Sequence, residues 1–419
     1  MSGWIVIDPF VHIAVKGDSC LLYNPLNGKI LEYGDSLVVE LVRDLTSPEN
    51  LLIKRISLKD RALPLSVFGF IEDLRSAFMG DFIEADASAV RPIQFPPVVQ
   101  VTRAVEYIRS DENRSVGEFA VKYLNRLLVY VNSDCNFDCD LCKSAYKQIN
   151  WCTKANQGTL DIAVLKSAVE SINCARLRSI SILGGDILSY PHIEELSRFL
   201  GKKPTHKIYY LHCENLIRSD KCLRTLELQG SRLCVLATPQ VTRPDLSRAS
   251  QSLRDLQIDH EWLIAVRSDK EFLEIRSVFE SLKITNYRIM PWFNGLNIEF
   301  FEEMVFIDVD DLARSGVSMK EIFAHQRLNK RDFGRLIILS NSDVHGNVNH
   351  HRLARLGEQT IDDALLEEMR SGQSWFRVRG KLVPCRDCLF EALCPPPSNY
   401  EIAIGRNNLC HIWDNHQPP

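Results

Sequence analysis

Three cysteines lie close together in the segment CNFDCDLC. Cys135, Cys139 and Cys142 form this cysteine loop, with the spacing C-x3-C-x2-C directly after an apolar run at 127–131. Three thiolates on one short loop can hold three irons of a cubane [4Fe–4S] cluster and leave the fourth iron open. The open iron can bind the amino and carboxylate groups of S-adenosylmethionine (SAM), whose reductive cleavage yields a 5′-deoxyadenosyl radical. A zinc loop is the alternative, but zinc sites usually offer paired cysteines, so this triplet favours iron and sulfur.

A Gly-Gly-Asp turn follows the apolar run at 179–183. It consists of Gly184, Gly185 and Asp186. Glycines let a ligand approach the backbone closely, and the acid can pair with a cationic amine. The alternative is that the turn serves only the backbone geometry needed between a strand and a helix. The ligand-binding interpretation gains weight here because the carboxyl ends of parallel strands meet at one sheet edge, where the cysteine loop also lies.

Four more cysteines lie near the C-terminus. These C-terminal cysteines have the spacing C-x2-C-x5-C followed by a fourth after fifteen residues, and they are Cys385, Cys388, Cys394 and Cys410. Four thiolates can hold a zinc ion or a fully ligated [4Fe–4S] cluster. Full ligation would leave no open iron to anchor a substrate, so such a cluster is better suited to exchanging electrons.

The elements that must position these cysteines follow from the hydrophobic pattern. Six apolar runs alternate with helical segments, at 127–131, 179–183, 207–212, 232–238, 260–266 and 286–290. This alternation predicts an α/β fold with parallel strands and right-handed crossovers, open or partly closed. Residues 1–90 instead predict short strands with turns at 17–18 and 27–28, then helices, as in a small winged-helix-like module. The Pro-rich stretch at 91–99 predicts a linker.

Composition limits the classes of partner. The chain has 419 residues, 45% of them hydrophobic and 25% charged, and a formal net charge of -4. With charges this balanced, the net charge of the chain gives no reason to expect binding to nucleic acid or to an anionic membrane. No apolar run is long enough to span a bilayer, and the N-terminus has no signal-peptide pattern, so we expect a cytoplasmic protein. Thirteen cysteines in a reducing compartment indicate metal or redox chemistry rather than disulfides.

The cysteine loop, the Gly-Gly-Asp turn and the strand–helix repeats to about residue 292 together resemble the radical SAM superfamily. The resemblance implies a partial (β/α)6 barrel, a catalytic [4Fe–4S] cluster on the cysteine loop, and SAM bound beside it. Two positions depart from the family pattern: Leu141 replaces an aromatic residue, and Asp186 replaces the commoner Glu. The family's adenine and ribose motifs are not readable, so Thr238 and Met290 are the expected further SAM contacts.

The C-terminal cysteines resemble the auxiliary-cluster (SPASM/twitch-like) domain of peptide-modifying radical SAM enzymes. The full domain holds two clusters. Here Ser398 and His351 stand where that domain would have further cysteines, which implies one auxiliary [4Fe–4S] cluster and the loss of the other.

Residues 1–90 resemble a peptide-recognition element that binds the leader of a ribosomal precursor peptide by strand addition. A generic small α+β domain is the alternative. The whole chain is also similar to the Gly-Gly-leader maturase group of Bacteroidales, in the segments YNPLNGK, CNFDCDLCKSAYKQ, MPWFNGLN and CPPPSNYE. These resemblances imply four parts: a leader-binding module at 1–90, a linker at 91–126, a barrel at 127–304, and an auxiliary-cluster domain at 305–419.

The expected function is therefore that of a radical SAM peptide maturase, an enzyme that cross-links or oxidises a precursor peptide. Its reductant would be a flavodoxin or ferredoxin, with neither nucleic acid nor membrane as a partner. One alternative is a protein oxidase like the anaerobic sulfatase maturases, although those keep both auxiliary clusters. Another is a non-catalytic partner or scaffold that retains the fold.

Overall fold

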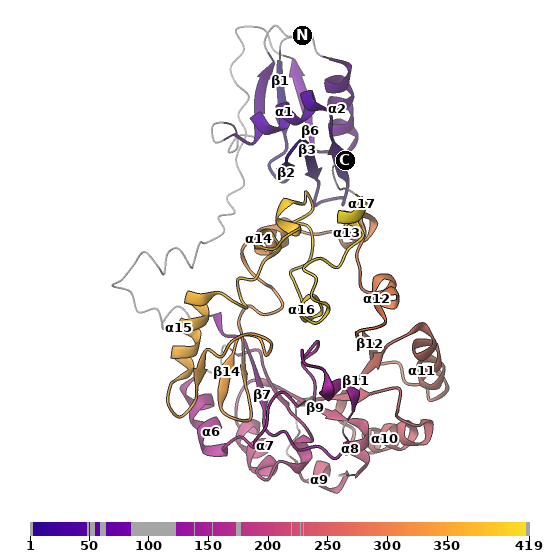
Figure 1. Cartoon of the computed structure of the whole chain (residues 1–419), viewed down its shortest axis with the longest axis vertical. Helices are drawn as coiled ribbons and strands as arrows, with labels where there is room; N and C mark the ends of the chain where they lie inside the picture. Colours follow the sequence, from indigo (N-terminus) through magenta and orange to yellow (C-terminus); the bar gives the residue numbers. More distant parts are fainter. Residues whose placement is uncertain are drawn as a thin grey trace.

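The computed structural model describes residues 3–47, 50, 55–58, 64–84, 123–137, 139–152, 154–172, 177–218, 220–226, 228 and 230–415. Most of the predicted linker at 91–126 lies outside the described residues. The described part is a mixed α/β structure with one large, mainly parallel sheet and two small antiparallel sheets. Figure 1 shows the small sheets at one end, the large sheet at the other and the C-terminal helices between them.

The N-terminal region forms two three-stranded antiparallel sheets and two helices. The first sheet contains β5 (Arg55–Leu58), β1 (Gly3–Ile7) and β6 (Gly80–Glu84), in that order. The second contains β2 (His12–Lys16), β3 (Ser19–Tyr23) and β4 (Ile30–Tyr33). The helices are α1 (Ser36–Leu45) and α2 (Leu65–Ser76), and their apolar faces cover a shared core with β1 and β3. The predicted turn at 17–18 joins β2 to β3, with Gly17 at a positive φ of 53°.

The six predicted strands of the α/β region are confirmed to within about one residue. All pair in parallel, in chain order: β7 (Arg126–Tyr130), β8 (Ser179–Leu183), β9 (His206–His212), β10 (Ser231–Ala237), β11 (Asp259–Val266) and β12 (Tyr287–Pro291). Their apolar runs are largely buried, except in β12, where Arg288 is exposed and the other four residues are half-buried. The sheet continues past β7 into β13 (Arg335–Ile338), β14 (Asp343–His345) and β15 (Ala354–Arg355).

Helices and short turns connect these strands. They are α5 (Asp140–Lys143), α6 (Ile162–Ser171), η1 (Ile187–Ser189), α7 (Ile193–Gly201), α8 (Cys213–Arg218), α9 (Asp220–Thr225), α10 (Arg243–Leu256) and α11 (Asp269–Ser281). Side-chain caps from Asp161, Thr242 and Ser268 set the starts of α6, α10 and α11. The large parallel sheet with its crossover helices is consistent with a partial barrel. It brings six strand ends to one edge.

The remaining elements lie between the large sheet and the N-terminal region (Figure 1). They are α12 (Ile298–Met304), α13 (Val309–Ser315), α14 (Met319–Arg327), α15 (Ile361–Ser371), η2 (Arg379–Lys381), η3 (Cys385–Asp387), α16 (Asn399–Ile404) and α17 (Ile412–Asn415). Capping boxes fix the starts of α13, α14, α15 and α16.

The N-terminal region packs directly on this C-terminal part. Leu21 and Tyr23 of β3 share a buried apolar cluster with Leu312 of α13 and Phe390. The Lys16 ammonium donates to Arg386 O at 2.8 Å and pairs with Glu391 at 3.0 Å. The two regions are therefore held together by a common core as well as by surface contacts.

Among the described residues, no helix combines the length and apolar character needed to cross a bilayer.

Candidate functional site

The cysteine loop begins at the carboxyl end of β7. Cys135 and Cys142 are partly exposed, whereas Cys139 is buried at the N-cap of α5. The Cys139 thiol donates to Cys142 Sγ at a sulfur–sulfur distance of 3.9 Å. This hydrogen bond lowers the pKa of Cys142 to about 6, because it stabilises the thiolate, and the nearby Lys147 acts in the same direction. The loop therefore favours a metal-binding thiolate at Cys142.

The Gly-Gly-Asp turn packs against the start of this loop. Gly184 and Gly185 have positive φ angles of 97° and 49°, which side-chain-bearing residues rarely adopt. A Cβ on Gly185 would lie 2.3 Å from Asp134 O, and the Asp186 amide donates to the same oxygen at 2.5 Å. The turn thus touches the residue immediately before Cys135.

Asp186 already has a local partner. Its carboxylate accepts from the Leu188 amide at 3.1 Å and so caps η1. Burial raises the pKa of Asp186, because the charged form loses solvation. One carboxylate oxygen fixes the turn, and the expected pairing with a cofactor amine would need the other.

Thr238 is linked to the cysteine loop through His212. The ring of Phe137, within the loop, lies 4.3 Å from the ring of His212. Burial lowers the pKa of His212 to about 3, so the imidazole is neutral. The Glu214 amide donates to its Nδ1, which leaves the proton on Nε2 to face Thr238 Oγ1 at 3.4 Å. The ends of β7, β9 and β10 therefore meet at one place.

A small pocket adjoins this meeting point. Thr238 lines it together with Asp140 and Leu141 of the cysteine loop, and with Arg267 and Trp292 from the ends of β11 and β12. Met290 does not line this pocket, but packs with Cys139, Trp151 and Trp292 in the apolar cluster beneath the loop. Thr238 therefore lies in the pocket beside the cysteine loop. Met290 lies instead in the apolar cluster that packs beneath the loop.

Arg267 is a site residue that the sequence pattern did not indicate. Its guanidinium donates to Asp140 at 3.3 Å and forms a closer ion pair with Glu271 at 2.7 Å. It follows the last residue of β11, and its position after an apolar run is the only sequence signal that could have drawn attention to it.

Two side-chain amides fix the segment after the cysteine loop by hydrogen bonds to distant backbone groups. The sequence pattern did not indicate them either. Asn349 accepts from the Lys147 amide at 2.8 Å and donates to Lys147 O at 2.9 Å. Gln148 makes the same two-way contact with the backbone of Phe293, at 2.7 and 2.9 Å. Their partners lie more than a hundred residues away in sequence, so spacing gives no sign of them.

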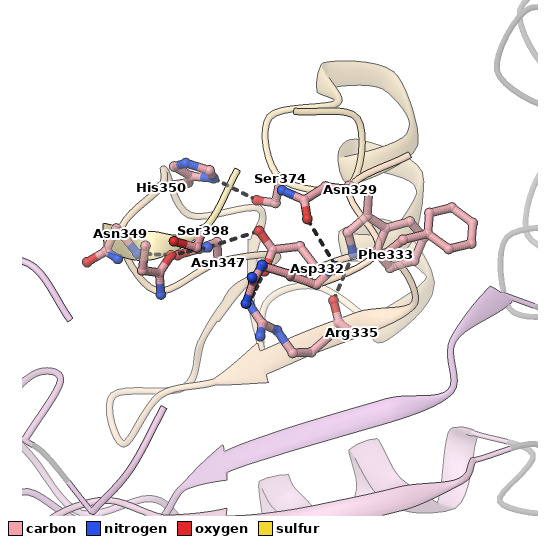
Figure 2. Close-up of polar contacts among 12 residues, drawn as sticks. Asn329, Asp332, Phe333, Arg335, Asn347, Asn349, His350, Ser374 and Ser398 are labelled. Carbon is pink, nitrogen blue, oxygen red and sulfur yellow. Dashed lines mark hydrogen bonds and ion pairs between the residues drawn. The ribbon is translucent and has the colours of Figure 1, made fainter. Parts of the chain in front are cut away.

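Asn349 belongs to a buried polar network, which Figure 2 shows. Asn347 accepts from the Asn349 amide at 3.0 Å and donates to Asp332 at 3.0 Å and to Asn399 at 2.7 Å. Asp332 also pairs with the buried Arg335. The network connects the segment after the cysteine loop with the start of β13 and with α16.

The C-terminal cysteines all line one pocket. Cys385, Cys394 and Cys410 are buried, and Cys388 is partly exposed. Ser398, which stands where an auxiliary-cluster domain with two clusters would have a further cysteine, caps α16 and donates its hydroxyl to Glu401. His351 is exposed. All four donors are thiols in an enclosed space, a donor set that fits an iron–sulfur cluster. In the described ranges, no three Cys, His, Asp or Glu side chains converge tightly enough to enclose a single metal ion.

No family model and no curated protein matches this chain. Among solved structures, anSMEcpe with bound AdoMet is similar at 12% identity and a TM-score of 0.45, over 64% of this chain and 84% of that one. Streptococcus suis SuiB bound to S-adenosylmethionine is similar at 13% identity and a TM-score of 0.35, over 94% of each chain. SuiB bound to precursor peptide SuiA gives 12% identity and a TM-score of 0.37, over 93% of this chain and 94% of that one.

Proposed function

We propose that this chain is a radical SAM enzyme that modifies a ribosomally made precursor peptide, by cross-linking or oxidation. The observation that supports this most is the convergence of the cysteine loop, the Gly-Gly-Asp turn and Thr238 at one edge of the parallel sheet. When bound, a [4Fe–4S] cluster and SAM would supply a carbon radical able to remove a hydrogen atom from the peptide.

The chain's own residues would hold and orient these groups. Cys135, Cys139 and Cys142 would ligate three irons, and the lowered pKa of Cys142 supports its thiolate form. The backbone of Gly184 and Gly185 would contact the cofactor, with Asp186 beside its amine. Thr238 and the backbone near Met290 would contribute further contacts. The buried aromatic rings of Trp151 and Trp292 pack beneath the loop in the same apolar cluster as Cys139.

The C-terminal cysteines would hold one auxiliary [4Fe–4S] cluster that accepts an electron from the peptide during oxidation. Four thiols in one pocket suit either such a cluster or a zinc ion, so the metal content of the purified protein distinguishes the two. A flavodoxin or ferredoxin would supply the electron that SAM cleavage requires.

The leader of the precursor peptide would bind to residues 1–90, the module that precedes the linker at 91–126. Within this module, β6 is an edge strand and α2 packs beside it. Phe68 of α2 and Ile83 of β6 are exposed apolar residues. An edge strand flanked by apolar side chains is suited to strand addition by an extended peptide. The barrel at 127–304 and the auxiliary-cluster domain at 305–419 would then receive the rest of the peptide.

A cleft of about 550 Å³ within the C-terminal part, at 307–396, would offer room for the peptide. Its walls come from α13, α14 and the turn at Pro395 and Pro396. α13 also contacts β3 of the N-terminal region through Leu312, so the cleft borders the module on one side.

The test is the iron and sulfide content of anaerobically purified protein, together with an assay for 5′-deoxyadenosine after reduction with SAM present. We expect about eight irons per chain, from two [4Fe–4S] clusters, and SAM cleavage. Zinc in place of iron would contradict the proposal. Intact clusters without cleavage would instead favour a non-catalytic partner.

A further inference from the structure

Arg379 is a buried cation beside the C-terminal cysteines. Its side chain is 7% exposed and lines the same pocket as the four thiols. One terminal nitrogen donates to Cys385 Sγ at 3.6 Å and to Asn407 O at 3.1 Å. Nε donates to Pro395 O at 2.6 Å. Because the guanidinium is planar and each of its nitrogens has a partner, its orientation toward the sulfur is fixed.

Glu401 balances this charge through the terminal nitrogen that does not contact the sulfur. The other terminal nitrogen of Arg379 donates to Glu401 Oε1 at 2.9 Å, and Glu401 is almost fully buried. The second oxygen of Glu401 accepts from the Ser398 amide at 2.8 Å, which fixes the carboxylate in the capping box of α16. The cation is thus held between the carboxylate and the thiol, so the sulfur faces the positive member of the pair.

A second donor points to the same cysteine set. The side-chain amide of Asn408, which is buried, donates to Cys410 Sγ at 3.9 Å. Two of the four sulfurs, those of Cys385 and Cys410, therefore accept a hydrogen bond from a buried side chain. Free thiols do not need such donors in order to pack.

We propose that Arg379 raises the reduction potential of the iron–sulfur cluster held by the C-terminal cysteines. The inference rests on the proposed function, because it requires that cluster. A cluster with four thiolates is anionic, and one-electron reduction adds a further negative charge. A buried cation and N–H···S hydrogen bonds stabilise the reduced form more than the oxidised one. The electrostatic effect is strong at this site because the surrounding protein screens it little.

The test measures the midpoint potential by redox titration with dithionite, which supplies the electron, monitored by electron paramagnetic resonance. The full chain carries Cys135→Ala, Cys139→Ala and Cys142→Ala, so that only the C-terminal cluster contributes a signal. Arg379→Gln combined with Glu401→Gln removes both buried charges together and leaves neither unpaired. We expect a more negative potential, because Arg379 contacts the Cys385 sulfur directly, whereas Glu401 acts on it through Arg379.

Two single variants make the sign of the effect testable. Glu401→Gln alone leaves Arg379 unbalanced and should make the potential more positive. Arg379→Lys keeps the charge but changes the hydrogen bond, so its potential should fall less than that of the double variant. Arg386→Gln is the control, since Arg386 is an exposed arginine in the same segment and should leave the potential unchanged.

Unchanged potentials in both the double variant and Glu401→Gln would overturn the role of Arg379 while leaving the cluster in place. If the Arg379 variants do not assemble the cluster, Glu401→Gln alone still tests the proposal. An unchanged or more negative midpoint potential in that variant would contradict it. Absence of iron from the starting protein is a different failure. It would refute the auxiliary cluster itself, and the inference with it.

Discussion

Gly185 cannot carry a side chain without displacing Asp134, the residue before the cysteine loop. We expect Gly185→Ala to lower the free energy of unfolding by about 2–3 kcal/mol, from a disfavoured positive φ and a clash with Asp134 O. Gly230→Ala is the matched control. Its φ is also positive, at 69°, but nothing lies within 4 Å of the added Cβ, so the loss should be about 1 kcal/mol. Urea unfolding of both variants measures the difference, and equal losses would contradict the close packing.

The three cysteines of the loop carry the proposed chemistry. We expect Cys135→Ala with Cys139→Ala and Cys142→Ala to abolish SAM cleavage and to remove about half of the iron, since one of two [4Fe–4S] clusters is lost. Cys222→Ala, at a partly buried thiol outside both cysteine sets, should change neither value. Cleavage that persists in the triple variant would refute the role of the loop.

Glu368 gives a pH dependence that can be measured without a cofactor. Burial raises the pKa of this carboxyl to about 7, from an ordinary value of 4.5. Between these values the folded state binds more protons than the unfolded state, so stability falls as the pH rises and levels off above about 7. We expect Glu368→Gln to be more resistant to heat than the unaltered chain at pH 8, with the difference shrinking toward pH 5. The exposed neighbour variant Glu367→Gln should show no such trend.

At the scale of elements, the segment after the cysteine loop depends on side-chain amides from distant loops. Asn349 satisfies both backbone groups of Lys147, and Asn347 connects it to the network in Figure 2. We expect Asn349→Ala to destabilise this contact by about 1–3 kcal/mol, the cost of unpaired polar groups. Hydrogen exchange at the Lys147 amide should then be faster. Asn341→Ala removes two exposed hydrogen bonds with Asp343 and should leave the Lys147 amide unaffected. Unchanged exchange in Asn349→Ala would contradict the contact.

At the scale of the whole molecule, the N-terminal region and the C-terminal cysteines share one apolar cluster. Leu21 and Tyr23 pack with Phe390, Cys394 and Cys410. Deleting residues 1–90 would therefore expose the wall of the cysteine pocket as well as remove the proposed leader-binding module. We expect the truncated chain to lose the auxiliary iron, about four irons per chain, whereas Ile83→Lys on the exposed side of β6 keeps it. Full iron content in the truncated chain would show that the shared core is not required for the cluster.

The alternation of strands and helices follows from the amino-acid pattern alone, and so do the candidate metal-binding cysteines. The apolar runs that form β7 to β12 are a local pattern, and the strand bounds agree with the prediction because most of these strands bury their apolar side chains in the core. The cysteine spacing and the Gly-Gly-Asp turn are equally local. Both lie at strand ends, where parallel pairing alone brings them to one edge.

The distant residues that support those sites are identified by the folded structure and not by the sequence pattern. Arg267, Asn349 and Arg379 have no spacing that marks them, because each acts through partners brought near by folding. The packing of β3 on α13 likewise depends on contacts across almost three hundred residues of chain. Local pattern identifies residues whose neighbours in sequence are also their neighbours in space. It does not identify a charged group, a side-chain amide or an apolar face whose partner is distant in sequence. Such partners come into contact only when the sheet and the C-terminal helices have assembled.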